Sequence, residues 1–303
     1  MLDEKEFHSG FVSIIGRPNV GKSTLINYLL GQKIAAVSPR PQTTRRLQLG
    51  IITTEAYQLI FVDTPGIHKP LSKLGEVMND SALGTLQDVD CIAWMVDGTM
   101  LPTEEDRMIA KQLAKLRNQD QILLLINKCD QISAEKALSV KEKYQELLSI
   151  RETFFISSKN GEGCDEMLQS IIRRLPEGPA FYDSDQITDL YEREIASDLI
   201  RESLLKNLDD EIPHAIAVRI DDYKDRSEIN SYILATLLLE REAHKGIVIG
   251  KNGEMIKKIG LDARREIEKM TDRKIYLELR VKVEKNWQNN PQILKILGYS
   301  KNE

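Results

Sequence analysis

A glycine-rich segment near the start of the chain has the composition of a phosphate-binding loop. Residues 16–23 read GRPNVGKS and match the spacing G-x-x-x-x-G-K-S, directly after an apolar run and before a helical pattern. The glycines let backbone N–H groups converge on phosphate oxygens, and the helix that follows adds positive potential at its amino end. We expect Lys22 to reach the β- and γ-phosphates of a nucleotide and Ser23 to bind Mg²⁺.

Two further segments have the chemistry of γ-phosphate sensors. The segment DTPG at residues 63–66 closes an apolar run; Asp63 is placed to hold Mg²⁺ through water, and the N–H of Gly66 is placed to donate to the γ-phosphate. In the segment PQTTRR at residues 41–46, a threonine can give its hydroxyl to Mg²⁺ and its N–H to the γ-phosphate. The sequence does not separate Thr43 from Thr44, and we prefer Thr44.

The segment NKCD at residues 127–130 predicts that the base is guanine. Guanine presents N1–H and a 2-amino group as paired donors, which the two oxygens of the Asp130 carboxylate match. Adenine has an acceptor at N1 and no 2-amino group, so it would leave Asp130 facing an unpaired lone pair. Lys128 can lay its alkyl stem over the base and Asn127 can brace the loops. The segment SSK at residues 157–159 can offer a backbone N–H to guanine O6.

Together these segments predict one site for GTP as substrate and Mg²⁺ as cofactor. The expected metal ligands are Ser23, Thr44 and Asp63. The candidate catalytic residues are Lys22, Asn19, Thr44 and Gly66. The expected nucleotide-binding residues are Gly16, Arg17, Pro18, Asn19, Val20, Gly21, Lys22, Ser23, Thr24, Asp63, Thr64, Pro65, Gly66, Ile67, Asn127, Lys128, Cys129, Asp130, Ser157, Ser158 and Lys159.

Two residues of this site bear on hydrolysis. Ile67 stands where Ras-type enzymes have a glutamine that orients the attacking water, and its side chain can neither donate nor accept a hydrogen bond. We therefore expect intrinsic hydrolysis of GTP to be slow. Asn19 lies inside the phosphate loop, where similar GTPases have an asparagine that helps to hold K⁺ against the phosphates. The alternative is that Asn19 only stabilises the turn, since asparagine is common in turns.

A second glycine-flanked loop, VIGKNG at residues 248–253, lies ahead of a basic helix. The pattern is that of a KH domain, whose GXXG loop clamps a single-stranded RNA backbone. Residues 241–285 contain 13 Lys and Arg against 8 Asp and Glu, in a chain of net charge -5, so this region is the basic patch of an acidic molecule. The alternative is a helix-breaking turn with solvated lysines. The expected RNA-binding residues are Val248, Ile249, Gly250, Lys251, Asn252, Gly253, Lys257 and Lys258.

The elements that must position these loops differ between the two halves. In the first half we expect strands at 11–16, 47–54, 57–63, 91–97, 122–127 and 154–157, and helices at 22–30, 74–86, 103–116, 134–148 and 165–175. Apolar strands that alternate with amphipathic helices predict a mostly parallel α/β sheet, with one antiparallel hairpin.

In the second half the expected order is α-β-β-α-α-β. It consists of a helix at 188–207, strands at 216–220 and 231–239, a turn at 246–253 between a short helix and a long one at 254–270, and a strand at 275–283. We therefore expect a P-loop GTPase domain over residues 1–175, a linker over 176–187 and an α+β type II KH domain over 188–303.

Composition bounds the class of protein. The 303 residues are 41% apolar and 29% charged, with no apolar run of about 18 residues and no signal-peptide pattern at the amino end. The three cysteines form no Cys-x-x-Cys pair, which favours a reduced compartment, no zinc site and a cytoplasmic protein.

The wording GRPNVGKSTLIN and PQTTR, followed by a single KH pattern, resembles the Era family of GTPases. The resemblance extends through KVEKNWQNN to the terminal LGY and covers nearly the whole chain. It implies a monomer that binds GTP, grips the 3′ end of 16S ribosomal RNA and assists assembly of the small ribosomal subunit. It also implies peripheral association with the inner face of the cell membrane. Two departures are Ser158, where many relatives have alanine, and Arg280, where an aromatic residue is common.

Three other functions compete with this interpretation. A non-enzymatic RNA-binding scaffold would hold GTP without hydrolysing it. An RNA-modifying enzyme would need a nucleophilic cysteine or a cofactor loop in the second half, and Cys164 lies before the linker. A membrane-signalling GTPase is the third alternative. Its contact with the membrane would have to be peripheral, since no lipidation motif is present.

Overall fold

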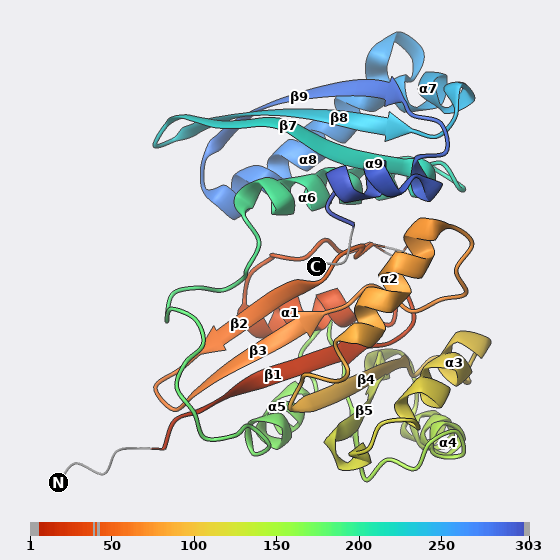
Figure 1. Ribbon diagram of the computed structural model, residues 1–303, viewed down its shortest axis with the longest axis vertical. Helices are drawn as coiled ribbons and strands as arrows, with labels where there is room; N and C mark the ends of the chain where they lie inside the picture. The colour runs from red at the N-terminus through yellow and green to blue at the C-terminus, as the bar shows by residue number, and fades with distance from the viewer. Residues whose placement is uncertain (1–5, 39, 41–42, 300–303) are drawn as a thin grey trace, which may run out of the picture. The chain divides into compact units, whose positions relative to one another are not determined.

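A computed structural model describes residues 6–38, 40 and 43–299 of the chain (Figure 1). The chain divides into two compact units, which are described separately. The first unit comprises Met1–Gln32, Arg45–Lys69 and Met78–Asp189. The second comprises Lys33–Thr44, Pro70–Val77 and Leu190–Glu303. Among the helices of the described residues, none is long and apolar enough to cross a membrane.

The first unit is built on a six-stranded sheet with the order β2-β3-β1-β4-β5-β6 (Figure 1). Its strands are β1 (His8–Ile15), β2 (Gln48–Thr53), β3 (Tyr57–Asp63), β4 (Cys91–Asp97), β5 (Ile122–Asn127) and β6 (Glu152–Phe155). Only the pairing of β2 with β3 is antiparallel; the other pairs are parallel. The predicted parallel sheet with one antiparallel hairpin is therefore confirmed.

Helices alternate with these strands along the chain. They are α1 (Lys22–Leu30), α2 (Lys73–Gly84), α3 (Glu104–Leu113), α4 (Ala134–Gln145) and α5 (Cys164–Ile172), with 3-10 turns η1 (Gln119–Gln121) and η2 (Cys129–Gln131). Every residue of β4 and β5 is buried, as expected for central parallel strands that are covered on both faces. The loops at the carboxyl ends of β1, β3, β4 and β5 consequently open onto one edge of the sheet.

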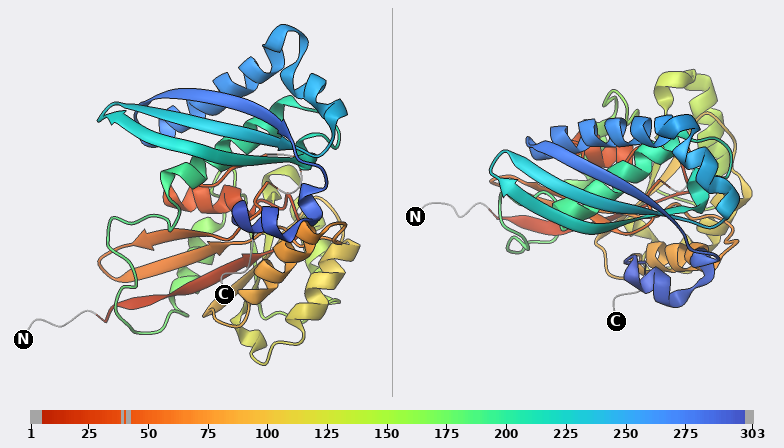
Figure 2. Two further views of the ribbon diagram at one scale, coloured as in Figure 1. Left: turned by 45° about the horizontal axis from the view of Figure 1, so that its top comes forward. Right: turned by 90° about the horizontal axis from the view of Figure 1, so that it is seen from above.

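The second unit is a three-stranded sheet with the order β7-β8-β9. Its elements are α6 (Glu192–Asn207), β7 (Ile216–Ser227), β8 (Asn230–Leu239), α7 (Glu242–Ile249), α8 (Glu254–Thr271), β9 (Lys274–Val283) and α9 (Pro291–Ile296), with 3-10 turns η3 (Pro213–Ala215), η4 (Lys251–Gly253) and η5 (Trp287–Asn289). Helices α6 and α8 pack together on one face of the sheet (Figure 2). The predicted order α-β-β-α-α-β, typical of a type II KH domain, is confirmed.

Two local predictions in this unit are wrong. Strand β7 continues to Ser227 instead of ending at Ile220, because its polar second half pairs with β8 across two register shifts. The turn expected at 246–253 is shorter, because α7 continues to Ile249 and leaves only η4 as the turn. Val248 is fully buried in the hydrophobic core, which explains why the helix extends through it.

The segment expected as a linker is bonded to the first unit. Backbone N–H groups of Ser9 and Ile51 donate to the carbonyls of Pro176 and Ile187, at 3.1 and 2.9 Å. The side chain of Gln58 donates to the carbonyl of Tyr182 at 2.8 Å. These bonds hold the connecting chain along the strands of the first sheet; the domain limits 1–175 and 188–303 remain predictions.

Candidate functional site

The phosphate loop lies between β1 and α1, and its lysine is buried. Gly21, with φ 112°, directly precedes the helix that Lys22 begins, a conformation that an L side chain would strain. The Lys22 ammonium donates to the carbonyls of Gly16 and Arg17, at 3.2 and 3.1 Å. Burial lowers the pKa of Lys22 to about 8, although the nearby Asp63 carboxylate acts in the opposite direction. The lysine is thus held close to the loop that it is expected to serve.

The DTPG segment is packed tightly against the phosphate loop. The Ser23 hydroxyl donates to Asp63 Oδ2 at 2.6 Å, and the Thr64 hydroxyl donates to the carbonyl of Ile14 at 2.6 Å. A Cβ at Gly66 would lie 2.6 Å from the backbone nitrogen of Pro18. Only glycine therefore fits this approach. Two adjacent hard oxygen donors, the Ser23 hydroxyl and the Asp63 carboxylate, fit the ligand preference of Mg²⁺.

A buried amide joins the expected base-binding loops to the phosphate loop. Asn127 Nδ2 donates to the carbonyl of Val20 at 2.6 Å. Asn127 Oδ1 accepts from the backbone N–H and the hydroxyl of Ser158, at 2.9 and 3.0 Å. The hydroxyl of Ser158 thus adds a bond that alanine, common at this position in the resembling family, could not make.

Asp130 lies where NKCD meets SSK. The Ser157 hydroxyl donates to Asp130 Oδ1 at 2.7 Å, and the N–H of Cys129 donates to the carbonyl of Ile156 at 3.1 Å. Lys128 has a left-handed backbone, φ 66°. The expected base readers are therefore brought together at the carboxyl ends of β5 and β6.

Two aspartates of this site were not predicted from the sequence. Asp97, at the end of β4, accepts from the Lys128 ammonium at 2.6 Å and lies 3.5 Å from the guanidinium of Arg17. Asp106 of α3 lies 3.4 Å from the same guanidinium. Burial alone would raise the pKa of Asp97, and hydrogen bonds from Lys128 and Thr99 outweigh it and lower that pKa. The available signal was an aspartate that closes an apolar strand, as Asp63 does.

Asn19, Thr43 and Thr44 lie outside helices and strands. Asn19 has φ 64°, a left-handed conformation that asparagine tolerates and that agrees with either role proposed for it. Thr43 donates its hydroxyl to the carbonyl of Arg40 at 2.9 Å, while Thr44 belongs, with Thr43, to the second unit. Pro41 and Gln42 lie outside the described residues.

The second glycine-flanked loop forms a tight turn before α8. Gly250, Asn252 and Gly253 all have positive φ, at 74°, 52° and 77°. Lys251 and Asn252 are exposed, as are Lys257 and Lys258 on α8. The Val248 side chain lies in the core, so only its backbone is available to a ligand. The loop therefore presents one lysine and several backbone groups to solvent.

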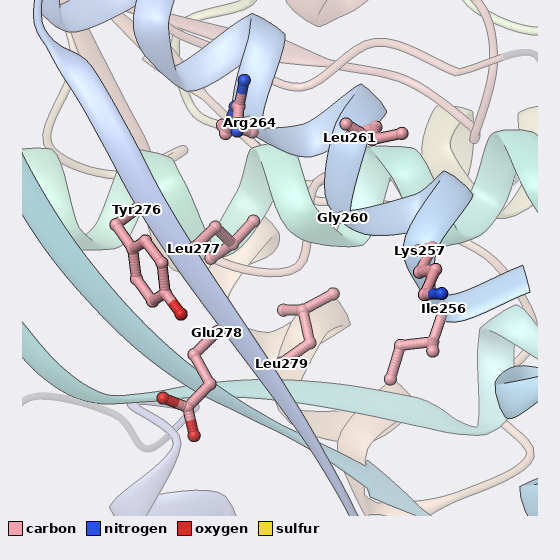
Figure 3. A pocket seen from close by; sticks show the side chains of 9 residues that line it. All are labelled: Ile256, Lys257, Gly260, Leu261, Arg264, Tyr276, Leu277, Glu278 and Leu279. Carbon is pink, nitrogen blue, oxygen red and sulfur yellow. The ribbon is translucent and has the colours of Figure 1, made fainter. Parts of the chain in front are cut away.

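A groove lies between α8, which follows this loop, and β9. It has a volume of about 490 Å³. Figure 3 shows Leu277 and Leu279 on the side of β9 that faces α8, and Tyr276 and Glu278 on the other side. Lys257 lines the groove but Lys258 does not. Its lining residues are Ile256, Lys257, Gly260, Leu261, Arg264, Tyr276, Leu277, Glu278 and Leu279.

The groove has the form of a nucleic-acid site. Its base is apolar, and Lys257 and Arg264 supply positive charge at its rim. Apolar and aromatic surface suits unstacked bases, while lysine and arginine suit phosphates. Arg264 and Tyr276 were not predicted from the sequence, because their approach depends on how α8 packs on β9.

Comparisons with known proteins find relatives of both halves of the chain. The family model described as 50S ribosome-binding GTPase matches residues 11–128, and the model described as KH domain matches residues 211–288. The chain is 46% identical to the GTPase Era of Ruminiclostridium cellulolyticum, over 98% of this chain and 99% of the relative. It is 45% identical to the GTPase Era of Lactobacillus helveticus, over 100% of this chain and 99% of the relative.

Two solved structures are similar over nearly the whole chain. One is a crystal structure of Era in complex with MgGDPNP and nucleotides 1506–1542 of 16S ribosomal RNA, with a TM-score of 0.92 and 36% identity, covering 97% of this chain and 99% of that one. The other is a variant of Aquifex aeolicus Era bound to GDP and AlF4⁻, with a TM-score of 0.92 and 36% identity, covering 97% of this chain and 100% of that one.

The low pKa of Lys22 predicts that nucleotide affinity depends on pH. Below its pKa of about 8 the free protein already carries the ammonium. Above it the free lysine is neutral, and a bound triphosphate must recover the proton, because phosphate charge raises the pKa. We expect affinity to fall by up to about tenfold per pH unit above pH 8, with net proton uptake on binding.

Calorimetric titrations from about pH 7 to about pH 9, in buffers of different ionisation enthalpy, measure both quantities. Lys22→Met is the control for ionisation of the nucleotide itself and should lack the lysine-linked proton uptake. Equal proton uptake by the parent and this variant would contradict the prediction.

Proposed function

The chain belongs to the Era family of GTPases, and on that premise we propose that it is a slow GTP-hydrolysing switch protein that binds the 3′ end of 16S ribosomal RNA and assists assembly of the small ribosomal subunit. The observation that carries the proposal is the presence in one chain of Asp130, held by the Ser157 hydroxyl where the NKCD and SSK loops meet, and of an apolar, basic-rimmed groove on the domain that carries the GXXG loop. A solved Era structure that contains both MgGDPNP and nucleotides 1506–1542 of 16S ribosomal RNA supports it.

In this proposal the phosphate loop positions and stabilises the triphosphate. The Lys22 ammonium replaces its bonds to the carbonyls of Gly16 and Arg17 by bonds to β- and γ-phosphate oxygens. Gly66 N–H and Thr44 contact the γ-phosphate. Ser23, Asp63 and Thr44 would hold Mg²⁺, which neutralises charge that develops on the phosphate oxygens. Ile67 offers the attacking water no polar group, so intrinsic hydrolysis is slow.

In the same proposal the groove binds a single RNA strand. Backbone N–H groups of residues 250–253 and the Lys251 ammonium contact phosphates, while bases enter the apolar floor at Leu277 and Leu279. Lys257 and Arg264 line the wall on α8.

The cysteines do not favour the RNA-modifying alternative. Burial raises the pKa of Cys91 to about 12 and the pKa values of Cys129 and Cys164 to about 11. Such thiols are almost wholly protonated at neutral pH and are poor nucleophiles. The scaffold alternative is separated by turnover: a scaffold would hydrolyse no GTP with any RNA or ribosomal particle present. The cytoplasmic location stays a prediction from the composition, and the monomeric state and peripheral membrane contact stay predictions from the resemblance.

Changing Asp130→Asn should exchange guanine preference for xanthine preference. An amide can donate to the oxygen that replaces the 2-amino group, and it can no longer accept both guanine donors. We expect GTP affinity to fall by about 10- to 100-fold and xanthosine triphosphate to bind better than GTP.

Fluorescence titration with both nucleotides measures this change. Asp165→Asn is the matched control, because it removes one exposed carboxylate at the start of α5. If Asp130→Asn still prefers GTP like the parent, Asp130 does not read the base.

Hydrolysis should be faster in KCl than in NaCl if Asn19 helps to hold K⁺. Asn19→Ala should then remove the difference between the salts while the rate in NaCl stays near that of the parent. Phosphate release at matched ionic strength measures this. Equal parental rates in the two salts would exclude K⁺ from the mechanism.

The double change of Lys251→Asp with Asn252→Asp should weaken binding of single-stranded RNA. It puts two carboxylates where phosphates should pass, and each lost phosphate contact should lower the salt slope of binding by about 0.7. The measurement is a titration of the RNA at several salt concentrations.

The matched control is Lys136→Asp with Ser139→Asp, which makes the same charge change at two exposed positions of α4. Circular dichroism and thermal unfolding check that both variants are folded in both units. RNA affinity that falls equally in the two variants would mean that net charge, and not the GXXG loop, governs binding.

A further inference from the structure

Flat side chains gather at one end of the second sheet, on the face away from α6 and α8. Tyr232 of β8 and Tyr276 of β9 are paired in register, and their rings stack with centroids 5.7 Å apart and planes 23° from parallel. The guanidinium carbon of Arg226, near the end of β7, lies 4.7 Å from the Tyr232 centroid and 5.9 Å from the Tyr276 centroid. We refer to these three side chains as the aromatic cluster.

The alternation of β9 puts the cluster on the open face of the sheet. Leu277 and Leu279 pack against the hydrophobic core, so Tyr276 projects to the opposite side (Figure 3). Tyr276 is 63% exposed, so its ring is accessible to a ligand. Exposed aromatic surface on a sheet is the means by which several RNA-binding modules stack bases.

Tyr276 connects the cluster to the groove. It lines the groove against α8 and also lines a second hollow, of about 480 Å³, together with Arg226, Asn230 and Lys274. The two hollows therefore meet at one ring. An RNA strand that leaves the groove past Tyr276 would therefore adjoin the second hollow.

The charges around the cluster suit a polyanion. The Tyr232 hydroxyl donates to Glu278 at 2.9 Å, and Arg280 donates to the other oxygen of the same carboxylate at 3.0 Å. The carboxylate is thus paired, and the Tyr232 ring is held in place. Within the part of the chain that the structure describes, neither Arg226 nor Lys274 forms an ion pair with a carboxylate, which leaves two cations beside the rings.

We propose that the aromatic cluster is a second RNA site, which stacks at least one base of the single strand where it leaves the groove at Tyr276; the inference rests on the proposed RNA-binding function. The Tyr276 ring and the Arg226 guanidinium offer flat faces to any base, so this site adds affinity with little sequence preference. Lys274 contacts the phosphate beside the stacked base.

The test compares RNA lengths on ring variants of the full chain. One RNA has about four nucleotides, enough to fill the groove, and others extend the same segment on its 5′ or its 3′ side. The parent should bind one extended RNA about tenfold more tightly than the short one. Tyr232→Leu should lose this gain but bind the short RNA like the parent, while Tyr232→Phe, which keeps the ring, should retain it.

Two further measurements separate stacking from charge and from misfolding. Lys282→Gln removes one exposed cation of β9 outside the cluster and should keep the gain. An extended RNA with one base-free ribose next to the groove segment should bind the parent as weakly as Tyr232→Leu binds the intact RNA. A 2-aminopurine at that nucleotide should be quenched on binding to the parent, a readout that needs no variant.

The outcomes separate failure of the second RNA site from failure of the proposed RNA-binding function. The second site is wrong if extended RNA binds the parent no more tightly than short RNA, if Tyr232→Leu retains the gain, or if 2-aminopurine is not quenched. RNA binding in the groove is not contradicted by any of these results. If the parent binds no RNA, or if the double change at Lys251 and Asn252 has no effect, the proposed function is wrong and the second site falls with it.

Discussion

The nucleotide site depends on one buried side chain, the amide of Asn127. Its Nδ2 donates to the phosphate loop at Val20, and its Oδ1 accepts two bonds from Ser158. Each buried polar atom must find such partners, because leaving one unpaired costs about 1–3 kcal/mol. Three loops that are far apart in the sequence therefore have one mutual arrangement in which this amide is satisfied, and that arrangement brings Asp130 and Lys22 to the same edge of the sheet.

A second constraint is electrostatic and works through Asp97. Two cations, from Arg17 in the phosphate loop and Lys128 in the NKCD loop, approach its carboxylate, and Asp106 approaches Arg17 from α3. A buried carboxylate between two cations fixes their positions and keeps their positive charge near the expected phosphates. The loop that should read the base and the loop that should hold the phosphates are thus joined twice, once by an amide and once by a carboxylate.

The sequence predicted what local patterns encode. The phosphate loop, the strand that ends at Asp63 and the α-β-β-α-α-β order all have short-range signals, and these elements were confirmed. Asp97 was missed because its pairing with Arg17 joins residues far apart in the chain and leaves no periodic trace. The second half of β7 was missed because its polar residues resemble a loop, and backbone pairing with β8 overrides that preference. The groove at Tyr276 could not be predicted, because it is formed by the packing of α8 on β9 and the spacing of residues in the sequence does not encode that packing.

Each of the two glycine-flanked loops holds a lysine near a turn that is expected to bind phosphate, but one lysine is buried and the other is exposed to water. Lys22 is buried, and burial lowers its pKa; a charge in such a setting interacts strongly over short distances but must be enclosed with its ligand. Lys251 is exposed on a turn before α8, where water and salt screen each contact. The first setting suits a small ligand that is bound in a closed loop. The second suits a long strand, for which affinity must come from several weak contacts in series, and this favours a continuous surface from the GXXG loop along the groove.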